Sequence, residues 1–162
     1  SVITASEDGD LCIVDHLNNA LIHRKRYNPI AKRGINDISI AGDFLILSNC
    51  SVGSSDKNLW LYHIDNKGFT LLDSVNLISD TSRSQVFSFN VELFSEGNYN
   101  YFMCTTEEGL LWHGVIKGDK FGAICFQENS LKGGAVLALD PTKKRCVSVN
   151  YDVKVLEISL NE

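Results

Sequence analysis

The sequence has little of what helical, membrane-spanning or secreted proteins need. It contains only two prolines and one methionine, and no long window carries apolar residues at the i, i+3, i+4, i+7 spacing of an amphipathic helix. No apolar run approaches the ~18 residues of a membrane span. The first residues lack the basic start and long apolar segment of a secretory signal. These absences disfavour a helical bundle, a membrane protein and a secretory precursor.

The sequence also has no large excess of basic or acidic residues. The 15 basic and 20 acidic residues leave a net charge of -5, with a pI near 5.3. This balance disfavours a general nucleic-acid binder, because affinity for the phosphate backbone comes from Lys and Arg. A local basic patch stays possible. The 44% of hydrophobic and 22% of charged residues are typical of a folded globular chain with its own core.

Cysteines are few and widely spaced. No two lie two to four residues apart, so the spacing of a zinc knuckle is missing. Their neighbours are apolar, which predicts buried free thiols and an intracellular, reducing location in cytoplasm or nucleus. The alternative, a disulfide or a metal site, needs pairing in space that the sequence does not show. The five are Cys12, Cys50, Cys104, Cys125 and Cys146.

What the sequence does contain is a series of short apolar, β-branched or aromatic runs between clusters of Gly, Asn, Asp and Ser. This pattern is typical of an all-β domain. The clearest unit is residues 2–14, where Asp8-Gly9 joins two runs as a hairpin turn. The predicted strands are 2–6, 11–14, 20–27, 35–41, 44–48, 58–64, 69–77, 85–94, 99–105, 110–116, 120–127, 134–139, 145–149 and 153–160.

The runs repeat at a long period. Four comparable strands end at Asp15, His63, Val115 and Glu157, at intervals of 48, 52 and 42 residues. A period of about 40–50 residues is the scale of a four-stranded propeller blade.

Residues 5–15 carry a family resemblance. They resemble the strand-turn-strand consensus of WD40 repeats, with Val14 where that family prefers Trp. Residues 104–115 are a weaker copy, with Val115 in place of Asp. The Gly-His pair of the family and its buried His–Ser–Asp–Trp network are missing. The chain is therefore similar to a divergent WD40-like β-propeller.

The resemblance implies an all-β propeller with about 3.5 blades, near residues 1–27, 35–77, 85–127 and 134–162. The predicted strands fall into sets of three, four, four and three. We expect the C-terminal half of a seven-bladed ring, completed by another segment or another chain; a closed four-bladed ring is the alternative. Each blade should be apolar on both faces, as residues 44–47 are, because it packs between two neighbours.

Motifs for catalysis are absent from the sequence. His16, His23, His63 and His113 show no metal-ligand spacing and no carboxylate partner, so packing roles are favoured. There is no Gly-x-Ser-x-Gly motif and no Gly-rich phosphate loop. The acidic pairs Glu7-Asp8 and Glu107-Glu108 are interpreted as turn formers. We predict no catalytic residue, metal or cofactor, and an enzyme is the less favoured class.

Two segments are predicted to contact partners. The basic cluster Arg24, Lys25, Arg26, Lys32 and Arg33 could bind phosphate or an acidic protein surface, or simply protect an outer strand from edge-to-edge association. The second segment is a polar loop. This loop spans residues 49–57. We expect it to emerge on the same face of a propeller as the connecting segments 28–34 and 78–84. Its candidate contact residues are Ser54, Ser55, Asp56 and Lys57.

The resemblance implies a non-catalytic scaffold or adaptor that binds other proteins within an intracellular multiprotein complex. The first alternative is an enzyme, or the substrate-holding subunit of an RNA- or protein-modifying complex. The second is a phosphate or nucleic-acid reader that uses the basic cluster.

Overall fold

The computed structural model describes residues 1–15, 17–26, 34–49, 57–128, 136–140, 145–149 and 153–157. Within these ranges the chain forms strands and no helix, so no described helix could cross a membrane. The strands are β1 (Val2–Ala5), β2 (Asp10–Asp15), β3 (Ala20–Arg26), β4 (Ile35–Ala41), β5 (Phe44–Asn49), β6 (Leu59–Asp65), β7 (Gly68–Val75), β8 (Ser88–Glu96), β9 (Tyr99–Thr106), β10 (Leu110–Lys117), β11 (Lys120–Glu128), β12 (Val136–Asp140), β13 (Arg145–Val149) and β14 (Val153–Glu157).

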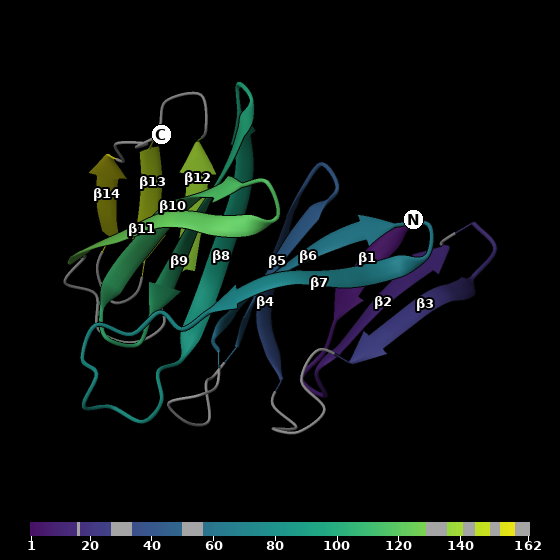
Figure 1. Cartoon of the computed structure of the whole chain (residues 1–162), viewed down its shortest axis with the longest axis horizontal. Helices are drawn as coiled ribbons and strands as arrows, with labels where there is room; N and C mark the ends of the chain where they lie inside the picture. Colours follow the sequence, from purple (N-terminus) through teal and green to yellow (C-terminus); the bar gives the residue numbers. More distant parts are fainter. Residues whose placement is uncertain are drawn as a thin grey trace.

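The strands form four antiparallel sheets that follow one another along the chain (Figure 1). Their orders are β1-β2-β3, β4-β5-β6-β7, β11-β10-β9-β8 and β12-β13-β14. Every sheet is a meander, in which each strand pairs with the next. The predicted sets of three, four, four and three strands are confirmed.

Tight turns join the strands where the sequence places Gly after an acidic residue. Gly9 has φ 81° and Gly109 has φ 79°, a left-handed conformation that other residues adopt only with strain. The Gly9 amide donates to the Ser6 carbonyl at 3.0 Å, and the Gly109 amide donates to Thr106 in the same way. The opening hairpin is therefore formed as its Asp-Gly turn predicts.

The second sheet is apolar on both faces, as the propeller prediction requires. On β5, Leu45 and Leu47 pack with Leu11 of the first sheet. Ile46, between them, points the other way and packs with Phe102 of the third sheet. Because successive side chains of a strand point to opposite faces, this continuous apolar run fills two cores at once.

Polar side chains of β4 hold the second sheet to the third. The Asp37 carboxylate accepts hydrogen bonds from the Val91 amide at 3.0 Å and from Asn90 Nδ2 at 2.8 Å. Ser39 Oγ accepts from the Leu93 amide at 2.8 Å. These bonds satisfy backbone donors of β8, so β4 and β8 lie side by side although they belong to different sheets.

The two strand boundaries that flank residues 76–87 differ from the sequence prediction by two and three residues. β7 ends at Val75 and not at residue 77, and β8 begins at Ser88 and not at residue 85. The reason is the side chain of Asn58, which takes the backbone groups of Leu77 and Val86 that a longer strand would use in its ladder.

The expected burial of the thiols is only partly correct. Cys12, Cys104 and Cys125 are free; Cys104 is buried and Cys12 half-buried. Cys125 is exposed, which contradicts the prediction. Successive side chains of a strand point to opposite faces, so Cys125 lies on the face of β11 opposite Ile124, which packs against the core cluster that contains Trp112.

Candidate interaction site

The segment between β7 and β8, residues 76–87, is the candidate interaction site, because side chains from other elements hold it with several hydrogen bonds. We refer to it as the connector. It leaves the second sheet, projects from the end of the molecule at the lower left of Figure 1, and returns into the third sheet. Asn58, which directly precedes β6, anchors both ends of the connector from within the core.

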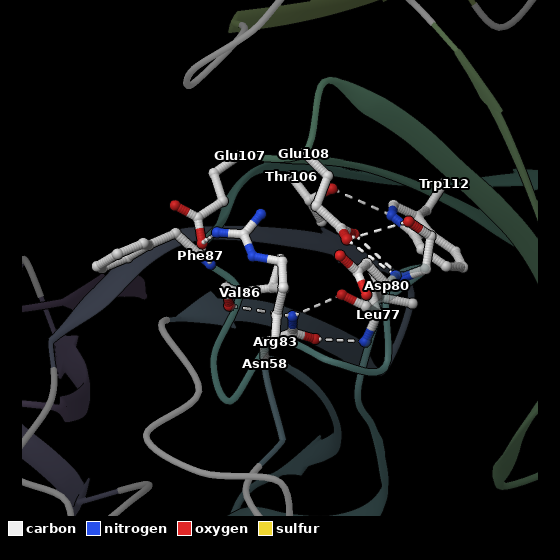
Figure 2. Close-up of polar contacts among 11 residues, drawn as sticks. Asn58, Leu77, Asp80, Arg83, Val86, Phe87, Thr106, Glu107, Glu108 and Trp112 are labelled. Atoms are coloured by element: carbon white, nitrogen blue, oxygen red, sulfur yellow. Dashed lines mark hydrogen bonds and ion pairs between the residues drawn. The ribbon is translucent and has the colours of Figure 1, made fainter.

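Asn58 is fully buried and uses its whole amide. Its Nδ2 donates to the Leu77 carbonyl at 3.0 Å and to the Val86 carbonyl at 3.3 Å, while its Oδ1 accepts from the Leu77 amide at 2.7 Å. Figure 2 shows this side chain between the two ends of the connector. Only an amide supplies donors and an acceptor in this arrangement, which explains why Asn stands here.

Two glutamates of the β9–β10 turn hold the exposed middle of the connector (Figure 2). Glu107 Oε1 accepts from Arg83 Nη2 at 2.8 Å and from the Phe87 amide at 3.1 Å. Glu108 accepts from the Ser79 hydroxyl at 3.0 Å, and from the amides of Ser79 and Asp80 at 3.1 Å each. Bonds from a carboxylate to backbone amides fix a loop more strongly than neutral bonds do.

Asp80 gives the connector a local turn of its own. Its Oδ1 accepts from the hydroxyl of Ser82 at 2.6 Å and from the Ser82 amide at 3.0 Å. These bonds, followed by the nearby Arg83 cation, lower the pKa of the Asp80 carboxyl. The group therefore stays ionised in neutral solution. Asp80, Thr81, Ser82 and Ser84 are exposed.

Beneath the connector lies a buried polar network. Ser88 Oγ is 2.7 Å from the Asn49 carbonyl and 2.5 Å from the Asn58 carbonyl, and it accepts from the Asn49 amide at 2.9 Å. Trp60 Nε1 donates to Asn49 Oδ1 at 3.0 Å. In the next sheet, Trp112 Nε1 donates to Thr106 Oγ1 at 3.2 Å. The connector is thus supported by a hydrogen-bonded polar network, while Asn76 Oδ1 at its start is buried without a hydrogen-bond partner among the described residues.

The described residues offer little for chemistry. No three His, Cys, Asp or Glu among them could hold a metal ion. Burial raises the pKa of the Cys104 thiol, so it stays protonated and unreactive. Burial also lowers the pKa of His113, which keeps this imidazole neutral. The Glu92 pKa is raised by desolvation and then by the Asp37 charge, but no described nucleophile contacts this carboxyl.

A hollow of about 520 Å³ lies between the first and second sheets. Isoleucines form much of its wall, and the carboxylates of Asp43 and Asp65 stand beside them. Its lining residues are Ser1, Ile3, Ile13, Ile22, Asp43, Ile64, Asp65 and Asn66.

The residues predicted to contact partners are not brought together by the described structure. Arg24, Lys25 and Arg26 lie on β3, the edge strand of the first sheet. Lys57 is half-exposed and stands directly before Asn58. The basic cluster and the polar loop therefore stay predictions. Lys32, Arg33, Ser54, Ser55 and Asp56 lie outside the described residues.

For three of the supporting residues the sequence interpretation was incomplete. Glu107 and Glu108 do form a turn, as predicted, but they also fix the connector. Asn58 was expected only as the first residue of a strand. The signal in the sequence was a polar Asn between a polar loop and an apolar strand. That signal does not reveal hydrogen-bond partners that lie 19 and 28 residues away.

Comparison with known proteins places the fold. No family model and no curated protein matches the sequence, but solved β-propellers match the structure. The chain is an all-β propeller with about three and a half blades.

Two of the solved structures that are similar to it illustrate the likeness. The Cps50 (Swd1) β-propeller domain of Myceliophteria thermophila aligns with a TM-score of 0.68 and 12% identity, over 97% of this chain and 50% of that one. Dihydro-heme d1 dehydrogenase NirN, solved in complex with DHE, aligns with a TM-score of 0.67 and 14% identity, over 96% of this chain and 32% of NirN. The chain thus spans half or less of the length of these neighbours. At such identities the likeness concerns the fold alone.

Proposed function

We propose that the chain is a non-catalytic, WD40-like scaffold module that binds other proteins in an intracellular multiprotein complex. The observation that carries this proposal is the connector. It exposes Asp80, Thr81, Ser82 and Ser84, yet Asn58, Glu107 and Glu108 hold it in one conformation. A pre-ordered exposed loop loses little conformational entropy on binding, which is what a recognition surface needs.

Further features support the WD40-like kind of propeller. In the second and third sheets a tryptophan of the third strand donates to a polar side chain on the second strand. This arrangement is similar to the tryptophan end of the family's hydrogen-bond network. The free thiols of Cys12, Cys104 and Cys125 favour an intracellular location. The likeness to the Cps50 (Swd1) β-propeller domain supports the fold on which this proposal rests.

The test is a comparison of partners bound by the intact protein and by surface variants. Thr81→Arg places a large cation on the exposed connector, whereas Thr70→Arg makes the same change at an exposed position of β7. Affinity purification from the native cells, followed by quantitative mass spectrometry, should show a stoichiometric partner. Thr81→Arg should reduce its recovery by about tenfold, the effect of ~1.4 kcal/mol at a contact.

Thr70→Arg should retain the partner. If both variants retain it, the connector is not the contact surface. If the protein purifies alone and turns over a small molecule, the scaffold function is wrong and the enzyme alternative is favoured.

A further inference from the structure

Strand β11 forms the outer edge of the third sheet. In the order β11-β10-β9-β8 no described strand pairs with its outer side. An edge strand presents a row of backbone N–H and C=O groups that can pair with another chain, and proteins normally protect such edges with charge or irregularity. β11 spans nine residues, Lys120–Glu128, and its only charged residues are these two ends.

The first part of this edge is protected. The β10–β11 ladder shifts register between Gly114 and Ile116, so Gly122 and Ala123 together face one residue of β10. Such a bulge bends the strand. In addition, the Phe121 amide donates to Asp73 Oδ2 of β7 at 2.9 Å. The regular part of the edge, with which no described strand pairs on the outer side, is therefore residues 124–128.

The outer strands of the first and second sheets are less suited to pairing. β3 contains Arg24, Lys25 and Arg26 in succession, which would repel a second copy of the same strand. β7 carries Asp73, which is already engaged with Phe121. By contrast, residues 124–127 of β11 are Ile, Cys, Phe and Gln, all without charge.

An aromatic side chain stands at the centre of the open segment. Phe126 is 49% exposed, and its ring lies against Trp112, with the ring centroids 4.7 Å apart. Trp112 itself is buried and cannot turn away, so Phe126 is held at the surface in a fixed place. Aromatic pairs across antiparallel strands are among the stabilising contacts of sheets.

We infer that residues 124–128 pair in antiparallel fashion with the same segment of a second copy of this chain. The two-fold axis passes between the two copies of Phe126. In this register Cys125 faces Gln127 of the second copy, and no two like charges face each other. The two third sheets then join into one continuous eight-stranded sheet, and each Phe126 covers the other. Because both copies contribute the same segment, this two-fold interface is closed and the assembly is a dimer.

The oligomeric state of the intact protein tests the pairing. A single strand pair buries less surface than a standard interface, so dimerisation should be weak, with half of the protein dimeric at roughly 10–100 μM. Sedimentation velocity should show this concentration dependence. Cys125→Lys, at an exposed side chain, should weaken the dimer by roughly three- to tenfold, because the two introduced cations lie diagonally across the two-fold axis on the same face of the joined sheet. Leu71→Lys on β7, also at an exposed apolar position, should leave it unchanged.

Cross-linking tests the register. In the Gln127→Cys variant, mild oxidation should join the introduced thiol to Cys125 of the second copy, and the linked peptides can be mapped by mass spectrometry. Ala123→Cys should give no such link. A protein that stays monomeric up to about 100 μM, or a dimer that Cys125→Lys does not weaken, would refute the inference. If Cys125→Lys instead abolishes binding of a different protein, the edge serves that partner and self-pairing is wrong.

Discussion

Replacing Asn58 by Ala tests whether one buried amide fixes the connector. The substitution removes three hydrogen bonds: two donated by Nδ2, to the carbonyls of Leu77 and Val86, and one accepted by Oδ1 from the Leu77 amide. Each is worth about 1 kcal/mol net, so the lost bonds amount to about 3 kcal/mol. Asn58, Leu77 and Val86 are at most 1% exposed, so water does not readily replace the missing side chain.

The free energy of unfolding of Asn58→Ala should therefore fall by about 3 kcal/mol, a large part of the ~5–15 kcal/mol of a typical domain. Urea unfolding followed by the fluorescence of Trp60 and Trp112 measures it. The midpoint should fall while the slope stays constant. Hydrogen exchange of the Leu77 amide should become faster. Asn66→Ala, at an exposed turn position, is the matched control and should stay within about 0.5 kcal/mol of the parent protein.

Two results would refute this reasoning. One is a loss below about 1 kcal/mol for Asn58→Ala, which would mean that the three bonds are replaced without cost. The other is an unchanged exchange rate at Leu77, which would mean that the amide has another acceptor in the folded protein.

Three further predictions follow from the same geometry. Glu107→Ala removes the partner of Arg83 and the acceptor of the Phe87 amide, and should speed tryptic cleavage after Arg83 several-fold, with a stability loss of about 1–2 kcal/mol that comes mainly from the amide bond because the ion pair is partly exposed; equal cleavage rates would contradict the described contact. The raised pKa of Glu92 means that ionising this carboxyl costs free energy in the folded state. The cost is absent below the pKa of the unfolded chain, where both states are protonated, and complete above the folded pKa, where both states are ionised. Glu92→Gln should therefore raise the melting temperature more at pH ~7 than at pH ~3.5, and an equal effect at both would argue against it. In the folded protein, iodoacetamide should alkylate exposed Cys125 while Cys104 reacts only after unfolding, as peptide mass spectrometry can determine; early labelling of Cys104 would exclude its burial.

The sequence by itself determined the strands, their turns and their grouping. Alternating or continuous apolar runs and Gly-containing turns are local signals, because the backbone conformation of a strand or a tight turn depends on a few adjacent residues. The Asp8-Gly9 turn and the two-sided apolar run at 44–47 are examples. The period of the third strands then indicated blades, and the structural neighbours support a propeller.

Only the tertiary structure decided where the connector and the open edge lie. Asn58 reaches partners 19 and 28 residues away, and Asp37 reaches Val91 across 54 residues. Such contacts depend on the path of the whole backbone, so the local pattern around Asn58 or Glu107 does not contain them. The exposure of Cys125 has the same origin: an apolar neighbourhood in sequence predicts burial, but a residue is buried only if another sheet covers its face of the strand.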